Sequence, residues 1–583
     1  MFLSLLSLAC IKDQVEDSVD ASCALTLATA SAVPVEASCQ AGTGPLGGIS
    51  DPFALELERR FTSEGSGVGV MPAIANLDDD NGDGKVDESD LPELIFTTLQ
   101  AEQLVVLSGA SGEVLWQLDG FLGLGGVSVG DVDDDGLPEI IAFSTEDEVV
   151  AVEADGEVLW RSRSFPLSIF PQPTVADLDG DGQLEVIGDV AVLQGKDGST
   201  LATLAAHRTT YHTPVVADLD GDGFKEILLG DRVFGADGGT AWTLRGSGQG
   251  SFSAVANIDA DPELEVFVVS GDRMYVHEHD GTVRDMTDLP GQNPGPPCIA
   301  DFDGDGIAEI AVPTDTQITL FNAQAVEIWS SSTNDASGLA GCSAFDVDDD
   351  GAYELLYADQ EAFRIFDGRT GAVLHEDLEH ASMTVWEYPV VADIDRDNAA
   401  EICLSSNVYD ASRAGSYQGV SCFGHAGEGW APGITSWPTH DFSDSSSGIE
   451  PPTDASGSSQ FRAHPYPERT DRPQLTGAVG EHCISECSTG TLHIGLQVWN
   501  SGAVDMPQGS PYTVYARSET AETAIQSGTL PSLSAGEAAA GFELQVPASE
   551  IGPLGLRIQL GEDLDAQECD LSDNAILLEE WGC

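Results

Sequence analysis

An acidic nine-residue loop recurs eight times along the 583-residue chain, and no other feature of the sequence restricts the fold as strongly. Regular copies carry Asp at positions 1, 3 and 5, Gly at position 6 and Glu at position 9, as in DVDDDGLPEI and DLDGDGQLEV. Apolar strands of the type P-x-V-A and EIIAF flank each loop. The copies begin at Asn76, Asp131, Asp177, Asp218, Asn257, Asp301, Asp346 and Asp393.

The spacing of the loops, about 40 to 55 residues, is the length of one four-stranded propeller blade. The sequence therefore predicts an all-β propeller. Eight loops favour eight blades, with seven as the alternative if a terminal repeat packs outside the ring. Trp116, Trp160, Trp242 and Trp329 recur at one point of the repeat. That recurrence favours packing of the rings between blades over a row of ligand-stacking platforms.

The loop spacing predicts calcium sites. A tight turn brings the side-chain oxygens of positions 1, 3 and 5, the carbonyl of position 7 and the carboxylate of position 9 around one point, a donor set that suits Ca²⁺. Glycine at position 6 permits positive φ. The expected ligands in the regular loops are Asp131, Asp133, Asp135, Leu137, Glu139, Asp177, Asp179, Asp181, Gln183, Glu185, Asp218, Asp220, Asp222, Phe224, Glu226, Asp301, Asp303, Asp305, Ile307, Glu309, Asp346, Asp348, Asp350, Ala352, Glu354, Asp393, Asp395, Asp397, Ala399 and Glu401.

Three loops differ from this pattern. The first is longer, and part of it fits an EF-hand-type loop with aspartate at the twelfth position and strands rather than helices at its flanks. Its expected ligands are Asn76, Asp78, Asp79, Asn81, Asp83, Lys85 (through its carbonyl), Asp87, Asp90 and Glu93. The loop at Asn257 has Pro262 in place of glycine, which predicts weak or lost binding. At Asp393, Asn398 replaces glycine, which asparagine can do because it tolerates the left-handed conformation.

These repeats resemble FG-GAP/VCBS repeats, the family that includes the integrin α-subunit propeller with its calcium-bearing D-x-D-x-D-G loops. The resemblance covers about residues 65–430 and implies a propeller with multiple structural Ca²⁺ ions. It implies little about activity, because function does not follow from fold. From about residue 472, alternating segments such as LHIGLQVWNSG and the ending ECDLSDN are similar to the CARDB-type, immunoglobulin-like modules of bacterial surface proteins. Such modules imply a small β-sandwich with an adhesive or spacing role.

Charge and cysteines indicate an exported protein. The net charge of −77 leaves no basic surface for nucleic acid and is consistent with many carboxylates acting as cation ligands. The first ten residues, MFLSLLSLAC, resemble a bacterial lipoprotein signal with Cys10 as the lipidated residue; a plain secretory signal is the alternative. The other ten cysteines predict disulfides in an oxidising compartment. Sequence proximity suggests the pairs Cys23–Cys39, Cys298–Cys342 and Cys403–Cys422, with Cys483, Cys487, Cys569 and Cys583 forming a last group.

The chain then divides into a signal (1–10), an acidic tether (11–54), a propeller (55–440), a Ser/Pro-rich linker (441–470) and a sandwich (471–583). The favoured function is a lipid-anchored or secreted, non-catalytic binding platform at a bacterial surface, with a protein or glycan as partner. The membrane would be contacted only through the lipid anchor. A carbohydrate-active enzyme of the polysaccharide-lyase kind is the alternative, with HRTTYH (His207, Arg208, Tyr211 and His212) as its nearest candidate group, and a purely structural envelope protein is a third. No catalytic residue is assigned.

Overall fold

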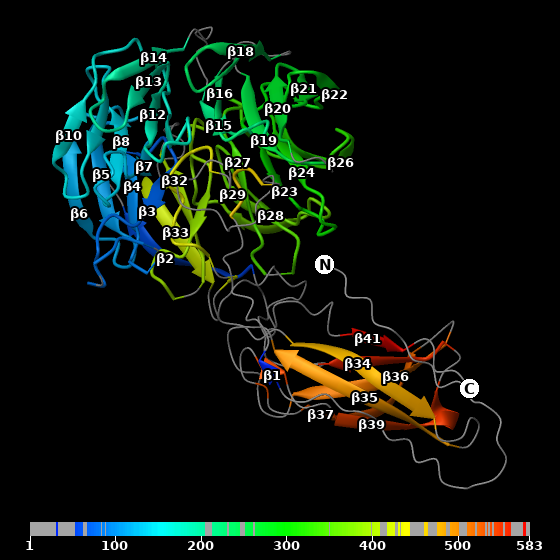
Figure 1. The fold of residues 1–583 in the computed structure, drawn as a ribbon. Helices are drawn as coiled ribbons and strands as arrows, with labels where there is room; N and C mark the ends of the chain where they lie inside the picture. Colours follow the sequence, from blue (N-terminus) through cyan, green and yellow to red (C-terminus); the bar gives the residue numbers. More distant parts are fainter. Residues whose placement is uncertain are drawn as a thin grey trace. The chain divides into compact units, whose positions relative to one another are not determined.

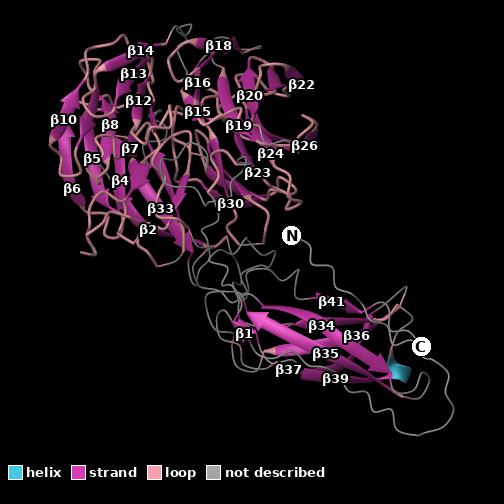
Figure 2. Ribbon diagram, viewed as in Figure 1, coloured by secondary structure: helices cyan, strands magenta, loops and turns pink. Residues whose placement is uncertain are grey.

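The computed structural model contains two compact units, one formed by Gly48–Pro467 and the other by Met1–Gly47 together with Glu468–Cys583. Figures 1 and 2 show that both are built from strands, and the one helix in the described residues is a single 3-10 turn, Ala548–Glu550. The structure describes residues 31–32, 53–61, 67–82, 84–87, 89–204, 213–229, 232–244, 251–259, 263–348, 350–397, 399–407, 417–425, 430–431, 433–442, 460–464, 475–484, 490–500, 510–518, 522–530, 533, 537–538, 542–551, 554–560 and 575–578.

The larger unit contains eight four-stranded antiparallel sheets in its described residues, one for each acidic loop. Seven of them follow chain order. They are β3 (Ala73–Ala75), β4 (Glu93–Thr97), β5 (Gln103–Ser108) and β6 (Val114–Asp119); β7 (Ser128–Gly130), β8 (Glu139–Phe143), β9 (Val149–Val152) and β10 (Val158–Arg161); β11 (Pro173–Ala176), β12 (Glu185–Gly188), β13 (Ala191–Gln194) and β14 (Thr200–Thr203); β15 (Val215–Ala217), β16 (Glu226–Leu229), β17 (Arg232–Phe234) and β18 (Thr240–Thr243); β19 (Phe252–Ala256), β20 (Glu265–Ser270), β21 (Arg273–His277) and β22 (Val283–Asp288); β23 (Cys298–Ala300), β24 (Glu309–Pro313), β25 (Gln317–Phe321) and β26 (Glu327–Ser332); and β27 (Cys342–Phe345), β28 (Glu354–Ala358), β29 (Phe363–Phe366) and β30 (Val373–Asp377).

The eighth sheet joins the two ends of the unit. It combines β31 (Val390–Ala392), β32 (Glu401–Ser406) and β33 (Gly419–His425) with β2 (Leu55–Phe61), which comes from the N-terminal end. Leu55 pairs with His425 and Phe61 with Val420. The first strand of each sheet lies towards the centre and the fourth at the periphery (Figure 1). This is the expected propeller fold; the number of blades in one closed ring stays a prediction.

Burial follows the position of each strand in its sheet. The inner strand β11 and its neighbour β12 are buried throughout, whereas the outer strand β14 alternates between exposed and half-buried residues. Apolar residues therefore run continuously through the inner strands and only intermittently through the outer ones, as expected when each sheet is covered on both faces by its neighbours. Separate apolar clusters between consecutive sheets form the core.

The recurring tryptophans pack between sheets, as predicted. Nε1 of Trp116 donates to the carbonyl of Ala154 (2.8 Å) and Nε1 of Trp160 to that of Gly195 (2.6 Å), both in the next sheet. Trp329 makes the same contact with Gly368 (2.7 Å). Each ring is thereby held against the turn between the third and fourth strands of the following sheet.

Two of the predicted disulfides are present. Cys298–Cys342 joins the inner strands of two neighbouring sheets, β23 and β27, and Cys403–Cys422 joins the adjacent strands β32 and β33. Cys10, Cys23, Cys39, Cys487, Cys569 and Cys583 lie outside the described residues, and so does the side chain of Cys483.

The centre of the propeller is occupied by residues that follow the last sheet. We call residues 430–431, 433–442 and 460–464 the central segment. Trp437 pairs with Ile74 of β3, Phe461 with Ile299 of β23, and Ala463 with Ala344 of β27. The side chains of Trp437 and Phe461 are fully buried. The segment thus contacts inner strands on opposite sides of the unit.

This finding differs from the linker expected at 441–470. Asp441, Phe442 and the described residues at 460–464 are buried inside the larger unit. Composition suggested a connector because Ser, Pro and Gly dominate residues 443–459, which lie outside the described residues. The few apolar and hydrogen-bonding residues at the two ends of that stretch determine where the chain packs.

The smaller unit is a β-sandwich. One sheet contains β34 (Leu475–Ile484), β35 (Thr491–Asn500), β38 (Glu537–Ala538), β39 (Phe542–Pro547) and β1 (Ser31–Ala32), and the other contains β36 (Pro511–Arg517), β37 (Glu522–Thr529), β40 (Leu556–Leu560) and β41 (Ala575–Leu578). Alternate residues of β35 and β40, such as Ile494 and Ile558, form its core. β1 pairs with β38, so part of the segment expected to be a tether belongs to this sandwich.

Candidate metal centres

The second acidic loop, residues 131–139, shows how the chain builds one centre. The two carboxylate oxygens of Asp131 accept the backbone N–H groups of Asp135 (3.2 Å) and Gly136 (2.9 Å). Oε2 of Glu139 accepts the N–H of Val132 (2.9 Å). These bonds close the loop on itself and fix the carboxylates of its first and ninth positions.

The same bonds recur around the propeller. In all eight loops the glutamate at position 9 accepts the N–H of position 2, at 2.8 to 3.1 Å. In six loops the carboxylate at position 5 accepts the N–H of position 7. The role of the position-7 carbonyls of Leu137, Gln183, Phe224, Ile307, Ala352 and Ala399 as ligands stays a prediction.

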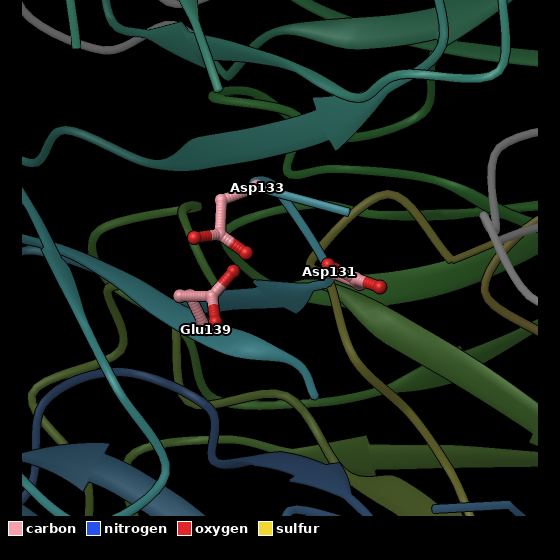
Figure 3. Close-up of side chains that lie close together, drawn as sticks. All are labelled: Asp131, Asp133 and Glu139. Atoms are coloured by element: carbon pink, nitrogen blue, oxygen red, sulfur yellow. The ribbon is translucent and has the colours of Figure 1, made fainter. Parts of the chain in front are cut away.

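Carboxylates at positions 1, 3 and 9 converge. Asp131, Asp133 and Glu139 each place one carboxylate oxygen within 4.8 Å of the other two. Figure 3 shows the carboxylates of Asp133 and Glu139 turned towards each other. The same grouping occurs at other loops of the described structure, among them Asp177, Asp179 and Glu185; Asp218, Asp220 and Glu226; and Asp301, Asp303 and Glu309.

Buried oxygens in this group lack hydrogen-bond partners. Oδ1 of Asp133 and Oε1 of Glu139 are buried without one among the described residues, and Glu139 is completely shielded from solvent. Leaving a buried carboxylate oxygen unpaired is unfavourable. A hard divalent cation would satisfy both oxygens, and the all-oxygen donor set fits Ca²⁺.

Burial also raises the pKa of the position-9 glutamates. In each case desolvation is the largest cause, and the neighbouring loop aspartates raise the value further. The pKa is about 8 for Glu93, Glu139 and Glu309, about 7 for Glu226 and Glu265, and about 10 for Glu401, and it is raised for Glu185 and Glu354. A bound cation would reverse this effect by favouring the ionised form.

Backbone geometry explains the glycines. Gly182, at position 6, has φ +85°, as the sequence predicted. Position 4 also adopts positive φ, which the sequence analysis missed: Gly180 has φ +73°, Asp134 +63° and Arg396 +58°. The signal was the first of the two glycines in D-x-D-G-D-G, at position 4, which three of the regular loops contain.

The inserted part of the first loop has hydrogen bonds like those of the regular loops. Asp79 accepts the N–H groups of Gly82 (2.7 Å) and Gly84 (2.8 Å), as a position-1 aspartate does. Asp90, which is fully buried, accepts the N–H of Asn81 (3.3 Å) and of Asp87 (3.0 Å). The structure therefore brings together these EF-hand-like positions.

Other predicted ligands of the first loop have different neighbours. Burial raises the pKa of both Asp78 and Glu93, and the nearby charges of Asp80 and Asp90 raise it further. Asn76 binds Thr435 of the central segment through its side-chain N–H (3.1 Å). Asp83 lies outside the described residues.

Among the described residues, arginines pair with carboxylates of three of the loops, and no spacing signal in the sequence pointed to them. Arg59 pairs with Asp395 (2.9 Å), and Arg369 binds both oxygens of Asp350 (2.6 and 3.1 Å). Arg284 pairs with Asp259 of the fifth loop (2.8 Å). Two predicted ligands, Asp350 and Asp395, thus already have a cationic neighbour.

The residues considered for catalysis do not assemble a site in the described structure. His207, Arg208, Tyr211 and His212 lie outside it. His440 is buried in the central segment, where its Nε2 faces the carbonyl of Pro214 at 2.8 Å. Its Nδ1 lies 3.2 Å from the carbonyl of Pro173 and 3.5 Å from the hydroxyl of Thr174.

No protein-family model and no curated protein sequence matches the chain. Among the part of the chain that the structure describes, no helix has the length and apolarity needed to cross a bilayer. Among solved structures, the V. cholerae biofilm matrix protein Bap1 is similar to this chain, with 19% identity and a TM-score of 0.62 over 71% of this chain and 100% of that one. Rhamnogalacturonan lyase PL11 of Bacillus licheniformis is similar with 17% identity and a TM-score of 0.43, over 61% of this chain and 71% of the lyase. The likeness to Bap1 is a likeness of fold.

Proposed function

We propose that the chain is an exported, calcium-stabilised propeller that acts as a non-catalytic binding platform for a protein or glycan at a bacterial surface. In this proposal the acidic loops of the FG-GAP/VCBS-like repeats hold structural Ca²⁺, and the CARDB-like sandwich serves adhesion or spacing. Cys10 carries the lipid anchor, which is the only contact with the membrane. Nucleic acid is not a partner, because the chain is too acidic.

The filled centre of the propeller carries the non-catalytic part of the proposal. Trp437 lies among the inner strands near their middle, and Trp386 pairs with Val70 at the end opposite the acidic loops. Both tryptophans are at most 1% exposed. Trp386 also contacts Phe252 edge-on, with ring centroids 5.6 Å apart. Side chains thus fill the axis where a substrate funnel of a catalytic propeller would be expected.

Basic and aromatic groups at the centre also contact other parts of the fold, although Nη1 and Nη2 of Arg462 and Nε1 of Trp437 are buried without a hydrogen-bond partner among the described residues. Nε of Arg462 donates to the carbonyl of His440 (3.0 Å), and the guanidinium lies 4.6 Å from the centre of the Tyr388 ring. The Tyr388 hydroxyl donates to the same carbonyl. A lyase needs such groups facing its substrate. Here they hold the central segment in place.

An oxidising compartment is supported by the two disulfides in the propeller. Bap1 is a biofilm matrix protein, which agrees with an extracellular role for a propeller of this fold. The alternative function is a carbohydrate-active enzyme of the polysaccharide-lyase kind.

The proposal can be tested with the full-length protein in calcium and in EDTA. Immobilised protein would be exposed to bacterial surface preparations and to a panel of neutral and acidic polysaccharides, and each soluble polysaccharide would also be assayed for unsaturated or newly reducing ends. We expect retention of a protein or glycan in calcium without any cleavage product. Turnover of a polysaccharide would instead establish the enzyme, and absence of any retention would contradict the platform.

A further inference from the structure

Arg284, on the outer strand β22, points into the acidic loop that has lost its regular sequence. Nη1 lies 2.8 Å from Oδ2 of Asp259 and 4.0 Å from Oε2 of Glu265. Nε lies 3.9 Å from Oε1 of Glu278. Asp259, Glu265 and Glu278 are also the three carboxylates whose oxygens gather within 4.8 Å in this sheet. The guanidinium therefore contacts every acid of the group.

Arg284 lies three residues after Gly281, the residue with positive φ in the turn between the third and fourth strands of its sheet. The equivalent residue is not basic in any of the other six sheets whose strands follow chain order. In the other sheets of chain order it is apolar, as Leu115, Leu159, Leu201, Ala241, Ile328 and Leu374. This arginine lies beside the one loop that has Pro262 at position 6. In the eighth sheet, Arg59 of β2 makes the same two kinds of contact, with the loop carboxylate of Asp395 (2.9 Å) and with the carbonyl of Ala110 (2.8 Å).

Arg284 also makes the contact that tryptophan makes elsewhere. The tryptophan position of the fifth sheet holds Asp285. Nη2 of Arg284 donates to the carbonyl of Ala323 (2.8 Å), in the turn between the third and fourth strands of the next sheet. Trp160 donates to the corresponding turn of its own neighbour through Gly195. One side chain thus replaces both the ring contact and a loop cation.

We propose that Arg284 is the resident cation of the fifth loop, so that this loop is stabilised without a metal ion. A planar guanidinium has enough donors to pair with several carboxylates and one carbonyl at once. Its side chain is 20% exposed, that of its nearest partner Asp259 36% and that of Glu265 0%, so the group is partly shielded from water. The inference rests on the proposed function only where it contrasts this loop with calcium-binding ones.

Full-length R284M tests the proposal in EDTA, where no loop holds calcium. The matched control is R273M on the neighbouring strand β21, since Arg273 pairs with Asp288 (3.0 Å) but is 44% exposed. We expect R284M to lower Tm by roughly 2–3 °C more than R273M, because it removes the cation that faces three carboxylates, of which that of Glu265 is buried. In a D259N background, R284M should lower Tm by a smaller amount, since one of the carboxylates that face Arg284 is no longer charged. If R284M does not fold, R284K provides the comparison, because lysine keeps the positive charge but lacks the planar guanidinium. The Tm of R284K should then be lower than that of the wild-type protein.

A second comparison separates this proposal from the calcium proposal. D259N should leave the calcium-dependent rise in Tm unchanged, whereas D133N in the second loop should reduce it. Equal effects of R284M and R273M in EDTA would overturn the role of Arg284, and so would a D259N protein that loses as much calcium stabilisation as D133N. A wild-type Tm indifferent to calcium would refute the proposed function alone, because the comparison in EDTA remains valid.

Discussion

Trp437 and Ile74 form a reciprocal main-chain pair although 363 positions separate them. The N–H of Ile74 donates to the carbonyl of Trp437 (3.0 Å) and the N–H of Trp437 donates to that of Ile74 (2.8 Å). The pair fixes the central segment to the first inner strand, β3. Other bonds of this segment reach Val129, through the carbonyl of Pro438 (3.0 Å), and Val216, through Asp441 (3.2 Å).

Truncation of Trp437 should therefore weaken the whole propeller. W437A removes a fully buried ring that stacks on Phe442 with centroids 4.7 Å apart. We expect a loss of about 3–5 kcal/mol in the free energy of unfolding. Urea unfolding followed by circular dichroism measures it, with L378A as control, because Leu378 is 62% exposed. A W437A protein as stable as L378A would show that the central segment does not stabilise the ring.

Calcium removal should destabilise the propeller if the acidic loops are occupied in solution. Each site contributes RT ln(1 + [L]/Kd), about 4 kcal/mol at a thousandfold excess over Kd. D133N removes one ligand oxygen and its charge, so it should lower Tm in calcium and change it much less in EDTA. D119N, at an exposed aspartate of β6, is the control. Scanning calorimetry in both solutions makes the comparison, and identical EDTA sensitivity of D133N and wild type would argue against a site at this loop.

The raised pKa values of the glutamates predict a pH dependence for the metal-free protein. In EDTA the pKa of Glu139 is about 8 in the folded chain, against an ordinary value of 4.5. The folded state therefore binds more protons than the unfolded state between these values, and stability must fall as pH rises from about 5 to 8. Calcium holds the carboxylates ionised, so the fall should be smaller in its presence.

Melting temperatures at pH 5 and pH 8, with and without EDTA, measure this effect. E139Q should reduce the slope in EDTA because glutamine keeps an acceptor for Val132 but does not titrate. E157Q, at an exposed glutamate of the same sheet, should leave the slope unchanged. A metal-free protein whose Tm is constant or rises over this interval would contradict the burial of the position-9 carboxyls.

The local pattern of the sequence was enough to predict the propeller and the loops, because each repeat carries its strands, its turn glycines and its acids within one short stretch. Glu139 and Val132 illustrate this: they are seven residues apart and bond as the motif requires. The role of the central segment could not be predicted in this way. Trp437 and its partner Ile74 are too far apart in the sequence for a local pattern to relate them, and the Ser/Pro-rich residues after Trp437 resemble a linker.

Arg284 shows a second limit of local patterns. Its partners Asp259 and Ala323 lie 25 residues before it and 39 residues after it. No spacing rule for metal ligands includes a basic residue on the fourth strand. The degenerate sequence of the fifth loop predicted weak metal binding, but it contained no sign of what would compensate the remaining acids.

The contact between Trp160 and Gly198 gives a test of packing between neighbouring sheets. A Cβ atom on Gly198 would lie 2.4 Å from Cε3 of Trp160, and Gly198 has φ +67°. Gly112 is its match in the first sheet, with φ +68°, but there the nearest atom to a Cβ would be 3.8 Å away, on Arg59. Both G198A and G112A lose about 1 kcal/mol to the left-handed backbone. G198A should lose a further 1–3 kcal/mol or so because the ring must move. Urea unfolding of the two variants isolates the contact, and equal losses would mean that the tryptophan yields freely and does not fix the spacing of the sheets.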